Sequence, residues 1–244
     1  MYATLLTSLK AKADVVELSD RDQAYNLFTL AADNNPDIVL ATNAALTDSK
    51  FTSVRRKACE YVRSHGGTLI FMGIFSSFAR PLAIRVLFHA FGLPGESGDY
   101  HRTTFEVNPA ATHVDTRTLV IVYSQKALHL ANVEQGDAIY LPSSASRTRS
   151  MVFAPRAVDL AQTPAVLGAC GRVKVGYLGD VKCGGGDGRG CAGYVWRCVL
   201  HYHCVGAMRA ARGILELWVW ADRGSATDFH GDSQWKDVRR SGML

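Results

Sequence analysis

The fold of this chain is decided by the stretch Gly66-Gly67-Thr68-Leu69-Ile70-Phe71-Met72-Gly73. Two glycines end a helical pattern, and a continuous apolar run of strand length follows them. Gly73 then opens a turn into the next helix. This order is typical of a buried parallel strand. Because open α/β sheets carry their functional groups just beyond the carboxyl ends of such strands, a site is expected directly after Gly73.

Helical and strand-like patterns alternate ahead of this stretch. They predict a helix over residues 2–13, a strand over 14–18, a helix over 19–32, a strand over 37–42 and a helix over 47–66. Thr47 or Asp48 can cap the last of these helices. Helices alternating with strands at this spacing favour right-handed β-α-β units. The sequence therefore predicts a doubly wound, flavodoxin-like α/β fold, with a mostly parallel sheet and helices on both faces.

The patterns beyond Gly73 are shorter. They predict a helix over residues 83–91, a loop over 96–104, strand-like runs over 119–123, 138–141 and 151–153, and a hairpin over 165–178 that turns near Gly171-Arg172.

The sheet is expected to lack its first strand. This fold normally begins with a central strand, but here Met1 stands directly before the first helical pattern. A gap beside a buried strand would leave its N–H and C=O groups without partners. Either the strand-like residues 214–220 fill the gap or the chain comes from an incomplete gene prediction, and we expect the second.

The character of the chain changes near Lys182. We assign residues 1–181 to the α/β domain and treat residues 182–244 as an atypical tail. All four tryptophans and four of the six cysteines lie in this tail, which has no sustained amphipathic period. Shifting the degenerate codons of residues 182–196 by one base permits an acidic, then apolar, helical sequence. We therefore expect the tail to be out of frame and poorly ordered.

Composition narrows the classes of partner. The net charge of +5 is scattered along the chain without basic blocks, so we expect no nucleic-acid partner. No apolar run reaches the roughly 18 residues of a membrane span, and the start lacks a signal-peptide layout. We therefore expect a soluble cytoplasmic protein with no membrane partner. The tail cysteines are separated by seven, six and five residues, which is too wide for paired zinc ligands, and we expect no metal or cofactor.

Two segments, residues 61–73 and 171–180, resemble the class I glutamine amidotransferase-like superfamily. The nearest branches are the ThuA-like trehalose-utilisation domains and a set of uncharacterised fungal proteins. The resemblance covers residues 1–181 and implies the same α/β fold.

The resemblance also implies that glutaminase chemistry is lost. In active members the strand ends in Gly-Ile-Cys-x-Gly, whose cysteine attacks the glutamine amide after activation by a late histidine. The matching residues here are Gly73-Ile74-Phe75-Ser76-Ser77, so Phe75 occupies the nucleophile position. The late histidine motif falls near Gly179-Asp180-Val181, where no histidine stands. The leading interpretation is a non-catalytic binding or accessory protein.

An alternative is a serine hydrolase that uses Ser76 as nucleophile, His101 as base and Asp99 or Asp180 as the acid. Ser76 and Ser77 could equally be helix N-caps, and Asp180 could cap the next turn. Tyr100, His101 and Arg102 could line a pocket for a sugar or an anion, or could simply form a solvated loop. The candidate ligand-binding residues are Gly73, Phe75, Ser77, Tyr100, Arg102 and Asp180. The partner is left open as a small molecule, another protein or a second copy of the chain.

Overall fold

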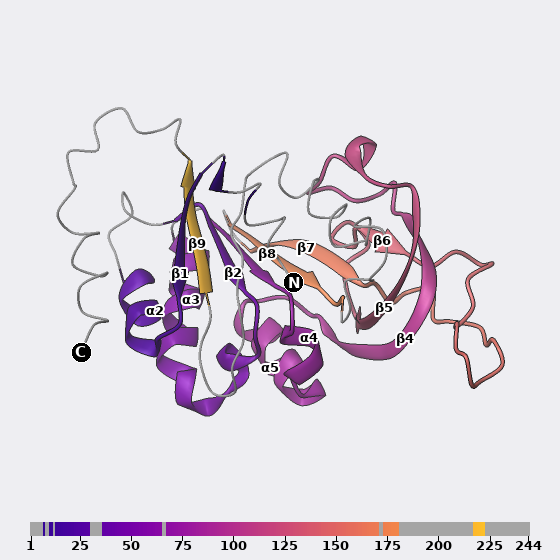
Figure 1. Ribbon diagram of the computed structural model, residues 1–244, viewed down its shortest axis with the longest axis horizontal. Coiled ribbons are helices and arrows are strands. Elements are labelled where there is room, and N and C mark those ends of the chain that lie inside the picture. The colour runs from indigo at the N-terminus through magenta and orange to yellow at the C-terminus, as the bar shows by residue number, and fades with distance from the viewer. Residues whose placement is uncertain are drawn as a thin grey trace.

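The computed structural model describes residues 7, 10–11, 13–29, 36–64, 67–170 and 173–180, together with the backbone of 217–222. The described strands form two sheets (Figure 1). Sheet A contains, in spatial order, β1 (Ala13–Leu18), β9 (Leu217–Asp222), β2 (Ile38–Ala41), β3 (Thr68–Phe71), β8 (Val173–Leu178) and β7 (Ala165–Cys170). Sheet B contains β5 (Val122–Ala131), β4 (Glu96–Val107) and β6 (Tyr140–Leu141).

Sheet A is mixed but mostly parallel. Its strands β2, β3 and β8 pair in parallel, whereas β9 is antiparallel to both β1 and β2, and β7 is antiparallel to β8. Strands β1, β2, β3 and β8 therefore all run in one direction. Sheet B is antiparallel throughout its pairs. The chain is thus an α/β protein with a mostly parallel sheet and a second, antiparallel one.

The helices begin where the sequence provides caps. Asp20 accepts from the backbone N–H of Asp22 and caps α2 (Arg21–Leu27). Asp48 accepts from the N–H of Lys50 at 2.9 Å and caps the short helix η3 (Ser49–Phe51), which leads into α3 (Thr52–Ser64). Further helices are η2 (Ala45–Thr47), α4 (Phe75–Phe78), α5 (Pro81–Ala90) and η4 (Thr116–Thr118). In Figure 1 helices α2, α3, α4 and α5 lie below sheet A, and sheet B lies to its right.

The core is continuous from the helices to sheet A. On α3 the side chains of Val54, Cys59 and Val62 are all buried, because their spacing places them on the face of the helix that packs on the core. The ring of Tyr61 packs against Phe28 of the segment after α2, and its hydroxyl donates to the carbonyl of Pro36 at 2.6 Å. Burial of that hydroxyl is therefore compensated by a hydrogen bond.

Several sequence-predicted elements are confirmed. The strands β1, β2 and β3, the helix α5 and the β7–β8 hairpin all lie where the patterns placed them. The expected helix over residues 2–13 falls largely outside the described residues, although the N–H of Ala11 donates to the carbonyl of Thr7 at 3.2 Å, as in a helix.

Three local predictions are wrong. Residues 96–104 form most of β4 rather than a loop, because a polar outer face and Gly98 hide the alternation of the strand. The strand expected over 119–123 begins only at Val122 and continues to Ala131. Residues 151–153 form an exposed bend instead of a strand, and their apolar side chains are largely open to solvent.

The expected gap in the sheet is closed. Strand β9 lies between β1 and β2, and Val219 is paired with Val16 on one side and Val39 on the other. The expectation of a missing strand is therefore wrong, because residues 217–222 supply the backbone partners that β1 and β2 need. The remaining residues of 182–244, for which we expected poor order, lie outside the described residues.

Replacing Val219 with proline should destabilise the protein, because β9 is paired on both sides and proline removes an N–H from the ladder. We expect a loss of roughly 3 kcal/mol in the free energy of unfolding measured in urea. Val219→Ala keeps the N–H and is the matched control. If the two variants unfold at the same urea concentration, β9 does not hold this place in the sheet.

Candidate functional site

The chain turns sharply after β3, as the sequence predicts. Before the turn, the N–H of Met72 donates to the carbonyl of Ala41 at 2.9 Å, which extends the pairing with β2. Gly73 then adopts a φ of 67°. A residue with a Cβ is strained in this left-handed region, so the turn requires glycine. The predicted turn at Gly73 is confirmed, and it brings Phe75 to the end of the strand.

Phe75 points into the core instead of toward solvent. Its side chain is 0% exposed, and its ring lies 5.0 Å from Phe71 and 6.1 Å from Tyr177. Phe88 of α5 completes the packing, because it contacts both Phe71 and Tyr177. We call Phe71, Phe75, Phe88 and Tyr177 the elbow cluster. Residue 75, at which the resemblance to amidotransferases would place a nucleophile, is thus a buried phenylalanine.

The elbow cluster is also where sheet B joins sheet A. The hydroxyl of Tyr177 donates to the carbonyl of Leu128 in β5 at 2.8 Å, and the N–H of Leu128 donates to the carbonyl of Gly179 at 3.0 Å. A Cβ at Gly179 would collide with the Leu128 carbonyl oxygen, so only glycine allows this approach. Burial raises the pKa of Tyr177, which keeps its hydroxyl neutral and able to donate.

The two serines after the turn differ in exposure. Ser76 is buried, and within the described part of the chain its Oγ has no hydrogen-bond partner. Ser77 is exposed. Neither is an N-cap, since Ile74 caps α4 without a side-chain bond and Arg80 caps α5. The N-cap interpretation is therefore wrong, because both serines lie within the short helix itself.

Two histidines meet on the inner face of sheet B. The rings of His101 on β4 and His129 on β5 are 4.4 Å apart and nearly perpendicular, and His129 also lies edge-on to Phe105. Both Nε2 atoms are buried without a hydrogen-bond partner among the described residues. Burial, followed by the charge of His101, lowers the pKa of His129 to about 3. Burial also lowers the pKa of His101, although Asp99 opposes this. Both imidazoles are therefore neutral at neutral pH.

The acids proposed for a hydrolase lie on either side of this pair. Asp180 forms an isolated bridge with Ala127, which in turn is paired with His101 across β4 and β5. Asp99 interacts with Gln162, whose Oε1 accepts from the Asp99 N–H at 2.6 Å. Because the Ser76 Oγ has no partner, the serine–histidine hydrogen bond of a hydrolase is not formed.

Strand alternation separates the remaining candidates. Tyr100 and Arg102 lie on the outer face of β4. His101 lies on the inner face, together with the buried side chains of Thr103 and Phe105. Tyr100 is half-exposed, and the Nζ of Lys126 stands 4.7 Å above its ring. The structure therefore does not bring the Tyr100, His101 and Arg102 side chains together in one pocket.

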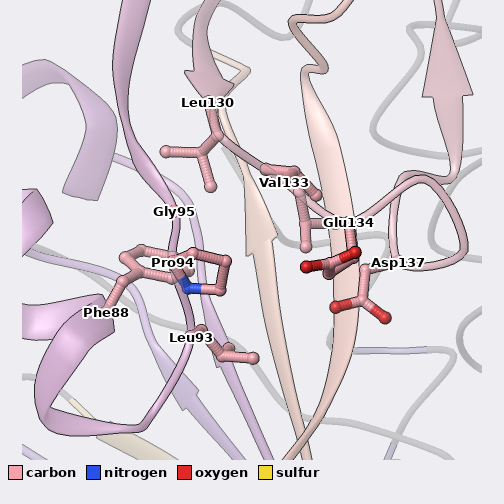
Figure 2. Close-up of a pocket in the computed structure, with 9 residues that line it drawn as sticks. Phe88, Leu93, Pro94, Gly95, Leu130, Val133, Glu134 and Asp137 are labelled. Carbon is pink, nitrogen blue, oxygen red and sulfur yellow. The ribbon is translucent and has the colours of Figure 1, made fainter.

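A small pocket lies elsewhere, between α5 and the turn that follows β5 (Figure 2). In the figure the carboxylates of Glu134 and Asp137 lie next to each other and face the apolar side chains of the other wall. The Nε2 of His113 is 3.3 Å from the Asp137 Oδ1. The pocket is lined by Phe88, Leu93, Pro94, Gly95, Leu130, Val133, Glu134, Asp137 and Val166. Its volume of about 10 Å³ holds one water molecule, not a metabolite.

Burial raises the pKa of Asp137, Glu134 adds to the effect and His113 opposes it. None of these three residues is predicted from the sequence, because isolated charges in a polar turn carry no periodic signal. His129 was not predicted either, although a lone histidine between Leu128 and Leu130 in an apolar run is a usable signal.

Comparison of the chain with models of protein families, with curated proteins and with solved structures finds no significant match. The resemblance to amidotransferases therefore stays a prediction. Over the described ranges, no three histidine, cysteine or acidic side chains are grouped as ligands for a metal. The helices in the described residues are all too short or too polar to cross a bilayer.

Substitutions at the turn should separate backbone strain from side-chain chemistry. Gly73→Val forces a branched residue to a φ of 67°, and we expect the free energy of unfolding to fall by at least about 1–3 kcal/mol. Ser76→Ala removes a buried hydroxyl that has no partner, so stability should be unchanged or slightly higher. Chemical denaturation measures both. Equal losses for the two variants would contradict the placement of the turn.

Stability should fall as the pH drops from about 6.5 to about 3. In this range His129 binds a proton in the unfolded chain but stays neutral in the folded protein, where it is buried. The slope from this one group approaches about 1.4 kcal/mol per pH unit. Between pH 6.5 and pH 5 the free energy of unfolding of the His129→Phe variant should therefore fall by about 2 kcal/mol less than that of the wild type. His89→Gln, at an exposed histidine of α5, is the control. Parallel pH profiles for the wild type and His129→Phe would refute this assignment.

Proposed function

We propose that this chain is a glutaminase-inactive, amidotransferase-like protein of flavodoxin-like architecture that acts by binding, as an accessory to another component. The observation that carries the proposal is the burial of Phe75 in the elbow cluster. A phenyl ring has no group that can attack a carbonyl, and no histidine stands near Asp180 in the sequence.

The packing around the turn supports the same conclusion. An active amidotransferase needs an open crevice at the carboxyl ends of the strands, where substrate and an oxyanion hole meet. Here Tyr177 lies against Phe75, and its hydroxyl is bonded to β5. In this proposal sheet B therefore occupies part of the space through which a substrate would reach the turn. Restoring one cysteine would not restore the crevice.

Binding is more readily placed on surfaces that remain accessible. Ser77, Tyr100 and Arg102 have exposed or part-exposed side chains and stay candidates for ligand contacts, as does Asp180 at the end of β8. Gly73 and Phe75 would act by shaping the turn. The ligand class is a small molecule or a protein, and the cytoplasm is the proposed location on the sequence grounds given above.

The alternative is a serine hydrolase that uses Ser76. The observation in its favour is that Ser76 Oγ, His101 Nε2 and His129 Nε2 are all buried without hydrogen-bond partners in the described residues, and unsatisfied polar groups of this kind gather at functional sites. Catalytic hydrogen bonds often tighten only when substrate binds. Against it, the side chain of Ser76 is buried.

Two covalent probes separate these functions. We expect the purified chain to release no ammonia from glutamine above background, and intact-mass spectrometry to show no adduct with a diazo-ketone analogue of glutamine. A fluorophosphonate should likewise leave the protein unlabelled, because Ser76, the proposed nucleophile of the alternative, is buried. Ammonia release that Phe75→Ala abolishes would overturn the proposal. Fluorophosphonate labelling lost in Ser76→Ala but kept in Ser77→Ala would establish the hydrolase instead.

A further inference from the structure

Three consecutive large apolar side chains stand exposed at the end of one hairpin. Met151 is 105% exposed, Val152 81% and Phe153 68%. We call residues 151–153 the apolar tip. Single exposed apolar residues are ordinary on protein surfaces, but a contiguous group marks an interaction site. In Figure 1 the segment between β6 and β7 extends at the right edge, on the far side from sheet A.

The hairpin that carries the apolar tip has a defined shape. The Ser150 Oγ accepts from the N–H groups of Val152 and Phe153, each at 3.1 Å. Below the tip, the N–H of Thr148 donates to the carbonyl of Arg156, and the N–H of Arg156 donates to the Thr148 Oγ1, both at 2.9 Å. These bonds give the hairpin a defined shape in which the apolar tip is exposed to solvent.

A row of cations lies beside this hairpin on the outer face of sheet B. Arg102 is paired with Lys126 on one side and bridges Arg149 on the other. Directly paired residues project their side chains to the same face, so three positive charges stand side by side. We call Lys126, Arg102 and Arg149 the cationic row. Like charges placed opposite each other are unfavourable, and an anionic surface would relieve their repulsion.

The hairpin itself adds to this positive charge. Residues 138–158 contain three arginines and no acidic residue, and Arg147, Arg149 and Arg156 are all exposed. The next acid, Asp159, accepts from the N–H of Ala161 and from the Gln162 side chain. Among the described residues no carboxylate forms an ion pair with the cationic row or with these arginines.

We propose that the apolar tip and the cationic row dock this protein onto an anionic lipid bilayer. The tip enters the boundary between headgroups and acyl chains, and the arginines at its base contact the acidic headgroups. This mode requires no spanning helix and does not involve the elbow cluster, and it shares only Arg102 with the candidate ligand contacts. The cytoplasmic leaflet, which is rich in anionic lipid, has the matching chemistry.

The arrangement fits a bilayer better than the other anionic surfaces. Single-stranded nucleic acids are held by aromatic platforms, but two of the three tip residues are aliphatic and offer no stacking face. A protein partner would need a pocket shaped to three successive side chains, whereas lipid adapts to them. One short apolar insertion is a weak anchor, so binding should be reversible and should need both the tip and the charge.

The test is flotation of the full chain with vesicles of phosphatidylcholine alone or mixed with phosphatidylserine. We expect binding to the mixed vesicles, and a partition coefficient at least about tenfold lower for the double variant Met151→Ser, Phe153→Ser, which loses two of the exposed apolar side chains that would enter the bilayer. Leu82→Ser is the matched control, because Leu82 on α5 is 68% exposed, as Phe153 is. Its partitioning should equal that of the wild type.

The charge is tested separately. Arg149→Gln should lower partitioning onto mixed vesicles about fivefold, whereas Arg56→Gln on α3 should leave it unchanged. Absence of binding to mixed vesicles would overturn the proposal. Equal binding by the wild type and the tip double variant would also overturn it, since charge alone would then explain adsorption. Tighter binding to a single-stranded oligonucleotide, lost in Arg149→Gln but kept in the tip variant, would assign the surface to nucleic acid instead.

Discussion

Tyr177 joins the two sheets through its hydroxyl group, and its ring packs in the elbow cluster. Its ring packs against Phe75 and Phe88, and its hydroxyl donates to the Leu128 carbonyl of sheet B. A net hydrogen bond contributes about 1 kcal/mol and each aromatic pair about 0.5–1.5 kcal/mol, so a large share of a marginal stability is concentrated at this point. Gly179 makes the approach of β5 possible. Strand β5, which carries Lys126 and His129, is therefore held in place by contacts with residues at the carboxyl end of β8.

This joint has a consequence for function. In open α/β proteins the carboxyl ends of the parallel strands are left clear for a ligand, but here the buried rings of Phe75 and Tyr177 pack together, and β5 is bonded to residues at the end of β8. The accessible polar and charged side chains lie instead on the outer face of sheet B and on its hairpin. Burial of the two histidines on the inner face of the same sheet keeps them neutral, so they contribute to packing and to acid sensitivity instead of to surface charge.

Sequence patterns identified the elements whose signals are local. The apolar run of β3, the cap at Asp48, which was one of two predicted positions, and the glycine after β3 are each fixed by residues within one turn or strand. The hairpin of β7 and β8 has the same local character. Strand β4 was missed because its outer face is polar and Gly98 interrupts it, so its alternation is visible only once its inner face is packed.

The sequence by itself therefore determined the α/β class, the turn at Gly73 and the absence of a nucleophile at residue 75, because these depend on residue type and short-range spacing. Only the tertiary structure decided that β9 fills the sheet between β1 and β2, that His101 meets His129, and that Lys126, Arg102 and Arg149 form one row. Each of these contacts joins segments far apart in the chain. Strand pairing depends on backbone groups that every residue carries, so the choice of partner leaves little trace in the residues themselves.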